Sequence, residues 1–349
     1  MALIPLNLGG DAYALGLGLG EFGRDAVHRH LRPLALWRFL TQQIGTPKAT
    51  AMRGLVEAQF PAYWAELRGL ADGLQLPLDE VFLWNCRGDY VHPDSVDGCT
   101  TVMSPTASGV LIAHNEDGFP ALRGHCGLLQ ARPETGLGFM SFVYPGSLPG
   151  HTFALNASGV AITVNNIRPT EIPPGIPRQI LGRAALDAKS LDEAVQVLTQ
   201  SGRAGAFHHA VAQLGSTRLV SVEATAAGAQ VTEVGQAMAH SNHLIGARLG
   251  SVAQRITGSS GARQACVDRL TAGLGAVIEP RQALAILRDT SDAQLPVYRC
   301  APDDPDDENT LATALFEIAA DRVDWAVFCE ESVDVAEMRG SVSPHRPLE

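Results

Sequence analysis

The stretch SVDGCTTVMS, from Ser95 to Ser104, places an Asp-Gly pair and a cysteine directly before a strand-forming run. Two interpretations compete for Cys99. In the first, it is a small buried apolar side chain, the usual environment of a free cysteine. In the second, the peptide bond before it breaks, since glycine at position 98 tolerates the strained backbone that attack by the adjacent thiol requires. The rest of the chain decides between them.

Breakage of that bond would turn Cys99 into an amino-terminal residue that carries both a thiol and a free α-amino group. The usual pKa of an α-amino group is about 7.7–8.0, so the new amine would be a general base near neutral pH. No histidine would then be needed to activate the thiol. This combination predicts a self-processing enzyme with a cysteine nucleophile.

The composition is that of an ordinary globular chain: 349 residues, 46% hydrophobic and 18% charged. A formal net charge of −11 argues against nucleic-acid and anionic-membrane surfaces, which need clustered lysine and arginine. We expect no signal peptide or membrane anchor, because no basic region leads into an apolar segment and no apolar run approaches the roughly 18 residues of a span. The cysteines are scattered without a CxxC pair, which predicts free thiols and a cytoplasmic location (Cys86, Cys99, Cys126, Cys266, Cys300 and Cys329).

The pattern of elements changes at Cys99. Apolar residues at helical spacing predict helices within residues 26–45, 49–74 and 76–86, with Pro61 starting a new turn or kinking the second one. After Cys99, short β-rich runs alternate with Gly, Pro and Asn, as in antiparallel hairpins. Further helices are expected within 176–188, 190–202, 262–270 and 280–288, before terminal strands at 310–321 and 323–328. This order favours an α+β layered fold in a single domain, 1–349.

Six motifs, in order along nearly the whole chain, resemble one family. They are DGCTTV around Cys99, GVLIAHNEDG (109–118), ALNASGVAITVNN (154–166), HSNH (240–243), VYRC (297–300) and TLATALFEI (310–318). The chain resembles the isopenicillin-N acyltransferase family, the peptidase family C45 branch of the amino-terminal nucleophile hydrolases. The resemblance implies a four-layer αββα sandwich and self-cleavage between Gly98 and Cys99. The two products, a helical α segment (1–98) and a β segment (99–349), are expected to stay associated.

The resemblance also implies a reaction. Cys99 would attack a non-peptide linear amide of a small molecule and form a thioester acyl-enzyme, which water then hydrolyses, without a cofactor. An acyl-CoA-dependent N-acyltransferase on the same fold is one alternative. The other is a non-cleaved, non-catalytic binding relative. We leave self-association into a homo-oligomer open. A papain-like protease fits poorly, because the Cys-Gly-x-Cys-aromatic pattern is missing around Cys99.

Two further site residues follow from the resemblance. Asp117 matches the family's aspartate at a strand end, where a carboxylate would hold the new amine; alone, an Asp before Gly118 is a common turn residue. Asn242 matches the oxyanion residue, whose amide would donate to the developing negative charge together with a backbone N–H. Without the resemblance, an Asn in that place is more often a loop cap.

Arg299 matches a late arginine that lies near the nucleophile in the family. A guanidinium there would lower the pKa of the Cys99 thiol and pair with Asp117, whereas a structural salt bridge is the plain alternative. Related hydrolases keep a second asparagine near the nucleophile. Asn165 and Asn166 both fall at that place, and the sequence does not decide which of them faces Cys99.

Two observations limit what the resemblance transfers. The bile-salt and penicillin V hydrolases, a sister group, carry an arginine where this chain has His114, so their substrates do not transfer directly. His208 and His209 are adjacent, so on a strand they point to opposite faces and cannot easily chelate one ion. No HExxH or similar ligand spacing occurs. We therefore assign no metal from the sequence.

Overall fold

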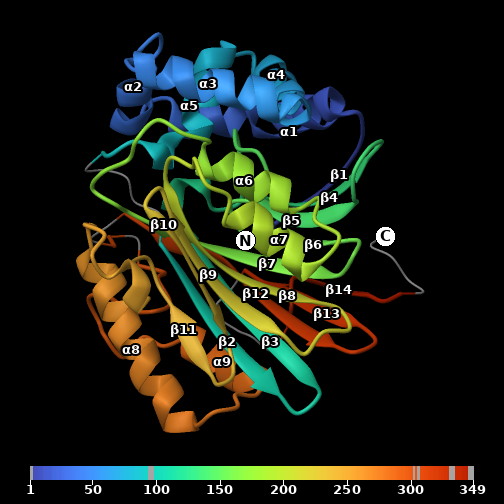
Figure 1. Cartoon of the computed structure of the whole chain (residues 1–349), viewed down its shortest axis with the longest axis vertical. Coiled ribbons are helices and arrows are strands. Elements are labelled where there is room, and N and C mark those ends of the chain that lie inside the picture. Colours follow the sequence, from blue (N-terminus) through green and yellow to red (C-terminus); the bar gives the residue numbers. More distant parts are fainter. Residues whose placement is uncertain (1–2, 93–97, 302, 305–306, 330–334, 345–349) are drawn as a thin grey trace.

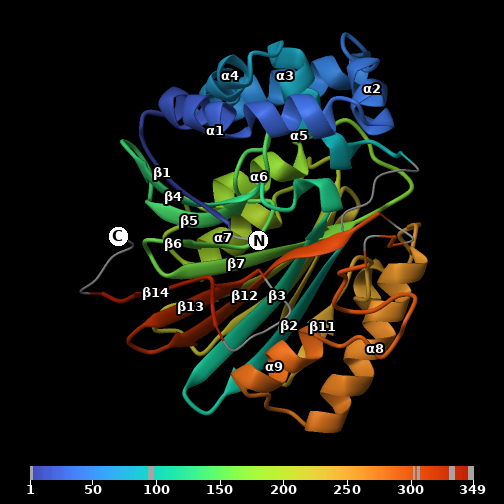
Figure 2. The ribbon, with the colours of Figure 1, turned by 180° about the vertical axis from the view of Figure 1, so that it is seen from behind.

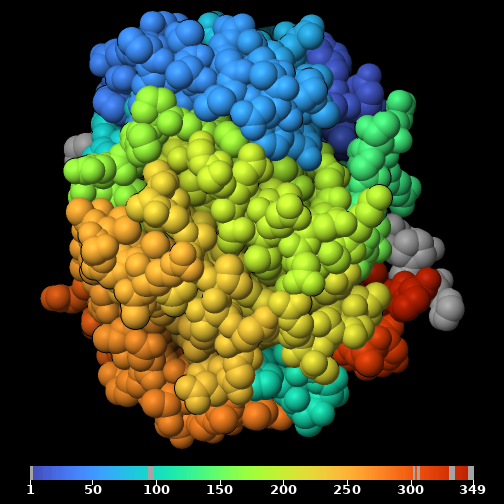
Figure 3. All heavy atoms as spheres, viewed as in Figure 1, coloured from blue at the N-terminus to red at the C-terminus, as the bar shows by residue number. Residues whose placement is uncertain are grey.

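The computed structural model describes residues 3–92, 98–301, 303–304, 307–329 and 335–344. Two β-sheets lie between two layers of helices (Figures 1 and 2). The helices that precede Cys99 form one end of the molecule, and the segment around α8 lies toward the other end of the same face (Figure 3). The fold is therefore the four-layer αββα sandwich that the sequence predicted.

Within residues 3–92, the amino-terminal layer consists of five α-helices, which pack above the first sheet. Asp11 caps the first of them by accepting a hydrogen bond from the Ala14 N–H at 2.8 Å. Pro61 is the first residue of the fourth helix, a position where its missing N–H costs nothing. The five are α1 (Ala12–Ala26), α2 (Ala35–Thr41), α3 (Pro47–Gln59), α4 (Pro61–Leu74) and α5 (Leu78–Asn85), with a π-helical turn (Val27–Leu31) after α1 and a 3₁₀ turn (Arg87–Asp89) after α5.

The first sheet has eight strands in the order β1-β4-β5-β6-β7-β8-β9-β10. Only the pairing of β1 with β4 is parallel, because β1 comes from the chain before the helical layer, and the other pairs are antiparallel. The strands are β1 (Ile4–Gly10), β4 (Gly127–Pro133), β5 (Phe139–Val143), β6 (Ala154–Asn156), β7 (Val160–Ile167), β8 (Ala206–Gln213), β9 (Leu219–Thr225) and β10 (Gly228–Glu233).

The second sheet has six antiparallel strands in the order β11-β2-β3-β12-β13-β14. Its centre is the hairpin of β2 and β3, which carries Cys99 on its first residue. The strands are β2 (Cys99–Thr106), β3 (Gly109–Gly118), β11 (Met238–His240), β12 (Asn309–Ala319), β13 (Val323–Phe328) and β14 (Met338–Val342).

Four helices from the second part of the chain complete the layers. Helices α6 (Arg178–Ala185) and α7 (Leu191–Leu198) lie on the eight-stranded sheet, and α8 (Gly258–Leu274) and α9 (Pro280–Leu287) lie on the six-stranded sheet. Strand β2 contacts β7 and β9, so the sheets face each other directly. That contact places the start of β2 between the sheets, at the edge nearest the first helical layer.

The sequence analysis missed several elements. Strands β1, β11 and β14 were not expected, and neither was α1, because the glycines of residues 9–23 disguise its pattern. The helix expected within 26–45 is divided into a π-helical turn and α2 by Pro33. Among the described residues, no helix combines the length and the apolar character that crossing a membrane requires.

Candidate active site

Cys99 opens β2 and pairs in register with Glu116 of β3. Its side chain is buried, with only 4% of the residue exposed. Its backbone N–H donates to Oδ1 of Asn242 at 2.9 Å, although Asn242 lies far along the chain, just after β11. The structure therefore joins two residues that the sequence analysis selected from separate motifs.

Gly98, the residue before Cys99, lies where a residue with a Cβ atom would not fit. Its carbonyl accepts a hydrogen bond from the Asp117 N–H at 3.0 Å. A Cβ added to Gly98 would lie 2.5 Å from Oε2 of Glu308 and 3.1 Å from Oδ2 of Asp117. Glycine at this position thus lets two carboxylates approach the bond between Gly98 and Cys99.

The side chain of Asn242 is held in one orientation. Its Oδ1 accepts from the Cys99 N–H and also from Nη2 of Arg263, at 2.7 Å. The backbone N–H of Asn242 donates to Oγ of Ser260. Its Nδ2 is buried and has no hydrogen-bond partner among the described residues. A buried amide donor without a partner, fixed next to a nucleophile, is the arrangement expected of an oxyanion donor before substrate arrives.

Arg263 of α8 is the residue that sequence reasoning missed. It is buried, and its Nη1 donates to the Cys99 carbonyl at 2.6 Å and to Oγ1 of Thr100 at 2.9 Å. Its burial lowers the pKa of the guanidinium, and the nearby carboxylate of Asp117 opposes that shift. No motif marks Arg263; the only signal in the sequence is an arginine within a helix that packs on a sheet.

Arg299 occupies a place one step further from Cys99. It forms ion pairs with Asp304 and Glu308, and its Nη1 donates to Oγ of Ser259 at 3.1 Å. The same Ser259 hydroxyl accepts from Nε of Arg263. Arg263 thus donates to the Cys99 carbonyl, and Arg299 contacts the same Ser259 hydroxyl as Arg263.

Asp117 faces the bond between Gly98 and Cys99 from the end of β3. Its Oδ1 accepts from Oγ1 of Thr310 at 2.7 Å, and its buried Oδ2 has no hydrogen-bond partner among the described residues. Burial raises the pKa of the neighbouring Glu308 carboxyl to about 7, against the effect of Arg299 and with that of Asp117. Two carboxylates and two arginines therefore surround Gly98.

The two candidate asparagines of β7 point to opposite faces, as neighbours on a strand must. Asn165 lies between the sheets, where its Oδ1 accepts from Thr101 and its Nδ2 donates to the His240 carbonyl at 3.1 Å. Asn166 lines the same pocket as Cys99, with its Oδ1 on Arg178 and its Nδ2 buried without a described partner. Asn166 is therefore the member of the pair that faces the pocket of Cys99.

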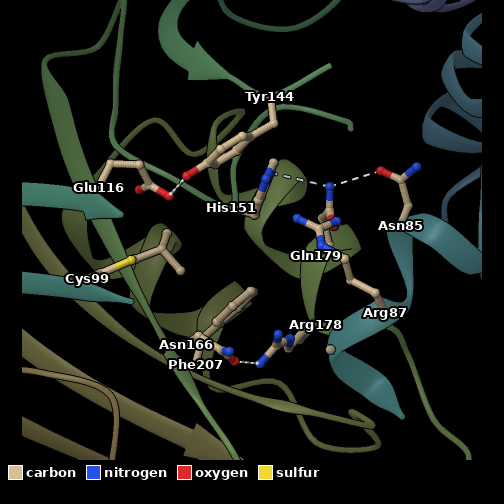
Figure 4. Close-up of a pocket in the computed structure, with 12 residues that line it drawn as sticks. Asn85, Arg87, Cys99, Glu116, Tyr144, His151, Asn166, Arg178, Gln179 and Phe207 are labelled. Carbon is tan, nitrogen blue, oxygen red and sulfur yellow. Dashed lines mark hydrogen bonds between the residues drawn. The ribbon is translucent and has the colours of Figure 1, made fainter. Parts of the chain in front are cut away.

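The pocket beside Cys99 has polar walls drawn from both sheets and the helical layer (Figure 4). On one side Glu116, Tyr144 and His151 lie together, with the Tyr144 hydroxyl donating to Oε1 of Glu116 at 2.9 Å. Burial lowers the pKa of His151 well below its usual value, so its ring is neutral. The remaining lining residues are Asn85, Arg87, Gly88, Val164, Asn166, Arg178, Gln179 and Phe207.

The neutral ring of His151 presents a lone pair to this pocket. Its Nδ1 lies 2.9 Å from the Leu148 carbonyl, which only a protonated nitrogen can bond. Its Nε2 is buried without a described partner and, in this tautomer, is an acceptor. The wall formed by Glu116, Tyr144 and His151 thus offers an acceptor pair to a bound molecule.

Comparison with known proteins agrees with this arrangement. The model of the acyl-coenzyme A:6-aminopenicillanic acid acyl-transferase family matches residues 104–328, more than half of the chain. The chain belongs to that family. The matched range holds Asp117, Asn165, Asn166, Asn242, Arg263 and Arg299, and it begins shortly after Cys99.

Two curated members of the wider group are similar over part of their length. The β-alanyl-dopamine/carcinine hydrolase of Drosophila melanogaster is 28% identical over 43% of this chain and 43% of its own. The acyl-coenzyme A:6-aminopenicillanic-acid-acyltransferase (40 kDa form) of Emericella nidulans is 26% identical over 55% of this chain and 54% of its own. The chain thus aligns with about half the length of these relatives.

Solved structures are similar at lower identity. A Caenorhabditis elegans orthologue of N-acylethanolamine-hydrolyzing acid amidase is 10% identical, with a TM-score of 0.44 over 62% of this chain and 92% of its own. A variant of the conjugated bile acid hydrolase of Clostridium perfringens is 11% identical, with a TM-score of 0.45 over 72% of this chain and 93% of its own.

Proposed function

We propose that this protein is a self-processing cysteine amidohydrolase that cleaves a small non-peptide linear amide. The observation that carries the proposal is the junction of Cys99 and Asn242. The Cys99 N–H donates to Oδ1 of Asn242, and the buried Nδ2 of the same amide has no described partner. A nucleophile and a fixed, available donor for an oxyanion therefore lie side by side.

Processing would begin with attack of the Cys99 sulfur on the Gly98 carbonyl carbon. A C–S bond forms, the C–N bond breaks, and the Cys99 nitrogen takes up a proton to become an amine. Water then hydrolyses the thioester, which leaves the α segment, 1–98, ending in a carboxylate and the β segment, 99–349, beginning at Cys99. The packing of Gly98 against Asp117 and Glu308 supports this site of cleavage.

Turnover would use the same sulfur on a substrate amide. The new α-amino group takes the thiol proton, and Asp117, whose Oδ2 lies near Gly98, would hold the resulting ammonium. The thiolate attacks the amide carbonyl, Nδ2 of Asn242 donates to the oxyanion, and the amine product leaves with the proton. Water then releases the acyl group from the thioester.

The pocket favours an acyl group that carries an amino group. Glu116 and the lone pair of His151 form acceptors beside Cys99, and one ligand atom of Glu116 lies within 4.8 Å of the thiol. That span matches a short aminoacyl group, whose ammonium would lie against Glu116 while its carbonyl meets the sulfur. The Drosophila relative, named as a β-alanyl-dopamine hydrolase, supports this class of substrate.

Acyl transfer is the second candidate, because the matching family is named for an acyl-coenzyme A acyltransferase. In that reaction an amine, rather than water, would take the acyl group from Cys99. The non-catalytic alternative predicts a chain that stays in one piece. A cytoplasmic location remains our proposal, supported by six cysteines that form no disulfide in the structure.

Two measurements test the proposal. Mass spectrometry of denatured, freshly purified protein should show two fragments that meet between Gly98 and Cys99, whereas one intact mass would favour the non-catalytic alternative. A panel of acyl amides, with and without an amino group on the acyl side, should show amine release that prefers the aminoacyl members. Addition of acyl-CoA and an acceptor amine to the same assay separates transfer from hydrolysis.

The variant Cys99→Ala should abolish both cleavage and amine release, because one sulfur serves both steps. Cys99→Ser is the matched control: a hydroxyl still attacks Gly98 in a preorganised site, but turnover should fall steeply since its ester is less reactive than a thioester. Full amine release from Cys99→Ala protein would show that the nucleophile is elsewhere.

A further inference from the structure

Three ligand-type side chains converge between the first strands of the six-stranded sheet. Register places Cys99 opposite Glu116, and Thr101 opposite His114, so these four side chains project from one face of the β2–β3 hairpin. The Cys99 sulfur, a ring nitrogen of His114 and a carboxylate oxygen of Glu116 all lie within 4.8 Å of one another. All three residues are buried. The sequence analysis found no metal motif, since this set comes from strand pairing rather than from spacing.

The hydrogen bonds around His114 fix which ring nitrogen carries its proton. Nδ2 of Asn165 donates to the His240 carbonyl, so Oδ1 of Asn165 is the acceptor of the Thr101 hydroxyl proton at 2.7 Å. Thr101 has no second proton, and Nδ1 of His114 must therefore donate to Oγ1 of Thr101, at 2.8 Å. Nε2 of the neutral His114 ring is left with its lone pair.

That lone pair points at a carboxylate. Nε2 of His114 lies 3.1 Å from Oε2 of Glu116. A buried ring nitrogen and a buried carboxylate oxygen at this separation share either a proton or a metal cation. The pair can thus exchange its proton for a cation, and the Cys99 sulfur lies within 4.8 Å of both ligand atoms.

The outer contacts of these ligands are those of a metal site. Thr101 orients His114 through its second nitrogen, and the Tyr144 hydroxyl donates to the other oxygen of Glu116. Metal-binding histidines and carboxylates are held in this way by neighbouring groups. One sulfur, one imidazole nitrogen and one carboxylate oxygen form a set that suits Zn²⁺, with a fourth position open to the pocket.

We propose that Cys99, His114 and Glu116 form a binding site for Zn²⁺ or a similar thiophilic divalent cation, which reversibly blocks the nucleophile. Binding exchanges protons for the metal: a Zn–S bond forms, and the thiol proton and the proton shared by His114 and Glu116 are released to solvent. The sulfur lone pair is then no longer available for attack. The inhibitory consequence rests on the proposed function of Cys99, whereas the binding itself does not.

Spectroscopy with Co²⁺ tests the binding without any assay of activity. Because Cys300 is the exposed free cysteine, all measurements use the Cys300→Ser background. Co²⁺ should produce a thiolate-to-cobalt charge-transfer band that excess Zn²⁺ removes. The band should be lost in His114→Gln and in Cys99→Ala. His209→Gln is the matched control: His209 is a buried histidine on β8, adjacent in sequence to His208 and facing away from the sheet interface, so it should keep the band.

Inhibition provides the second measurement. Zn²⁺ should inhibit amine release, a zinc chelator should restore it, and His114→Gln should keep its uninhibited activity while requiring about 100-fold more Zn²⁺ for the same inhibition. Absence of a thiolate–cobalt band, or a band of equal strength in His114→Gln, would overturn the site. A band with no detectable amide hydrolysis would keep the metal site and reject the proposed function instead.

Discussion

The two helical layers cover the two sheets in different ways, and the arginine that hydrogen-bonds to the Cys99 carbonyl comes from the layer on the six-stranded sheet. Helices α1 and α4 of the first layer pack backbone to backbone through glycines: a Cβ on Gly69 would lie 2.0 Å from the Tyr13 carbonyl oxygen. In the other layer, Arg263 of α8 instead donates hydrogen bonds to the Cys99 carbonyl and to Oδ1 of Asn242. The α1–α4 contact is a close backbone packing, whereas α8 provides an arginine that hydrogen-bonds to Cys99.

This contrast predicts which substitutions affect chemistry and which affect folding. Changes on the α8 side should reduce cleavage and turnover while the protein stays folded. Changes in the α1–α4 contact should reduce stability while the chemistry of the folded protein is kept. The first layer also lines the pocket, through Asn85 at the end of α5 and through Arg87 and Gly88 in the turn that follows.

The largest expected effect is that of Asn242→Ala. It removes the Nδ2 donor and the acceptor of the Cys99 N–H, so amine release should fall by roughly 10²–10³-fold, the usual loss for one oxyanion donor. Cys99 should still react with an alkylating probe. Steady-state kinetics measure amine release, and alkylation rates measure the reactivity of Cys99. An unchanged turnover would remove Asn242 from the mechanism.

Arg263→Lys should have the next largest effect. A lysine keeps the charge but cannot bond the Cys99 carbonyl, Thr100 and Asn242 together, so the orientation of Asn242 is lost. Misplaced catalytic groups cost up to about 10²-fold, and we expect a loss of about 10- to 100-fold in kcat with KM little changed. Arg269→Lys, on the same helix, is the control and should leave kcat as it is. Equal kinetics for Arg263→Lys and wild type would contradict the contrast between the layers.

Arg263 also shows where sequence reasoning stops. The layered fold could be predicted because it depends on local β-patterns, and short motifs selected Cys99 and Asn242, which the structure brings together while their catalytic roles stay predictions. Arg263 could not, because its role depends on how α8 crosses the sheet edge, and nothing within the helix marks that. Asn165 and Asn166 could not be separated for a similar reason: the side that a strand residue faces depends on the partner sheet, whose register a motif does not give.

Helix α1 gives the opposite lesson. Its glycines at positions 16, 20 and 23 look unfavourable for a helix when each is judged by propensity alone. In the structure Gly16 and Gly20 meet α4, where an added Cβ on Gly16 would lie 1.8 Å from the Glu66 carbonyl oxygen. Tertiary contact overrides local preference there, and that contact is visible only once both helices are placed.

The third prediction tests this contact. Gly69→Ala forces α1 and α4 apart, because the atoms that its Cβ would meet are backbone, and should lower the free energy of unfolding by about 1–3 kcal/mol. Gly54→Ala is the matched control: an added Cβ on this helical glycine meets nothing within 4 Å, so the change should stabilise by about 0.5–1 kcal/mol. Chemical denaturation measures both. If Gly69→Ala were as stable as Gly54→Ala, the close packing of the first layer would be wrong.

The last prediction concerns pH. Burial lowers the pKa of His151, His208 and His209 well below the usual 6.5, so the folded protein keeps all three neutral. Below pH 6.5 the unfolded chain takes up protons that the folded chain does not, so stability is present above that pH and is lost as the pH falls. Each histidine contributes a slope of about 1.4 kcal/mol per pH unit.

Protonation of Glu308 opposes this loss of stability over part of the same pH range. Burial raises its pKa to about 7, so the folded protein binds that proton as the pH falls from 7 toward the ordinary glutamate value, which offsets about one histidine. Burial also raises the pKa of the Glu66 and Asp89 carboxyls, and it lowers the pKa of a fourth histidine, His114, to about 3. We expect the four histidines to outweigh the carboxyls between pH 6.5 and 5, so stability falls with the pH. Urea unfolding of the Cys99→Ala chain, which stays in one piece, should show a lower midpoint at pH 5 than at pH 7. His209→Phe should make that decline shallower by about 1.4 kcal/mol per pH unit, because its ring no longer titrates in the unfolded chain. A midpoint that rises between pH 6.5 and 5 would mean that these histidines accept protons in the folded state, so that burial does not keep them neutral.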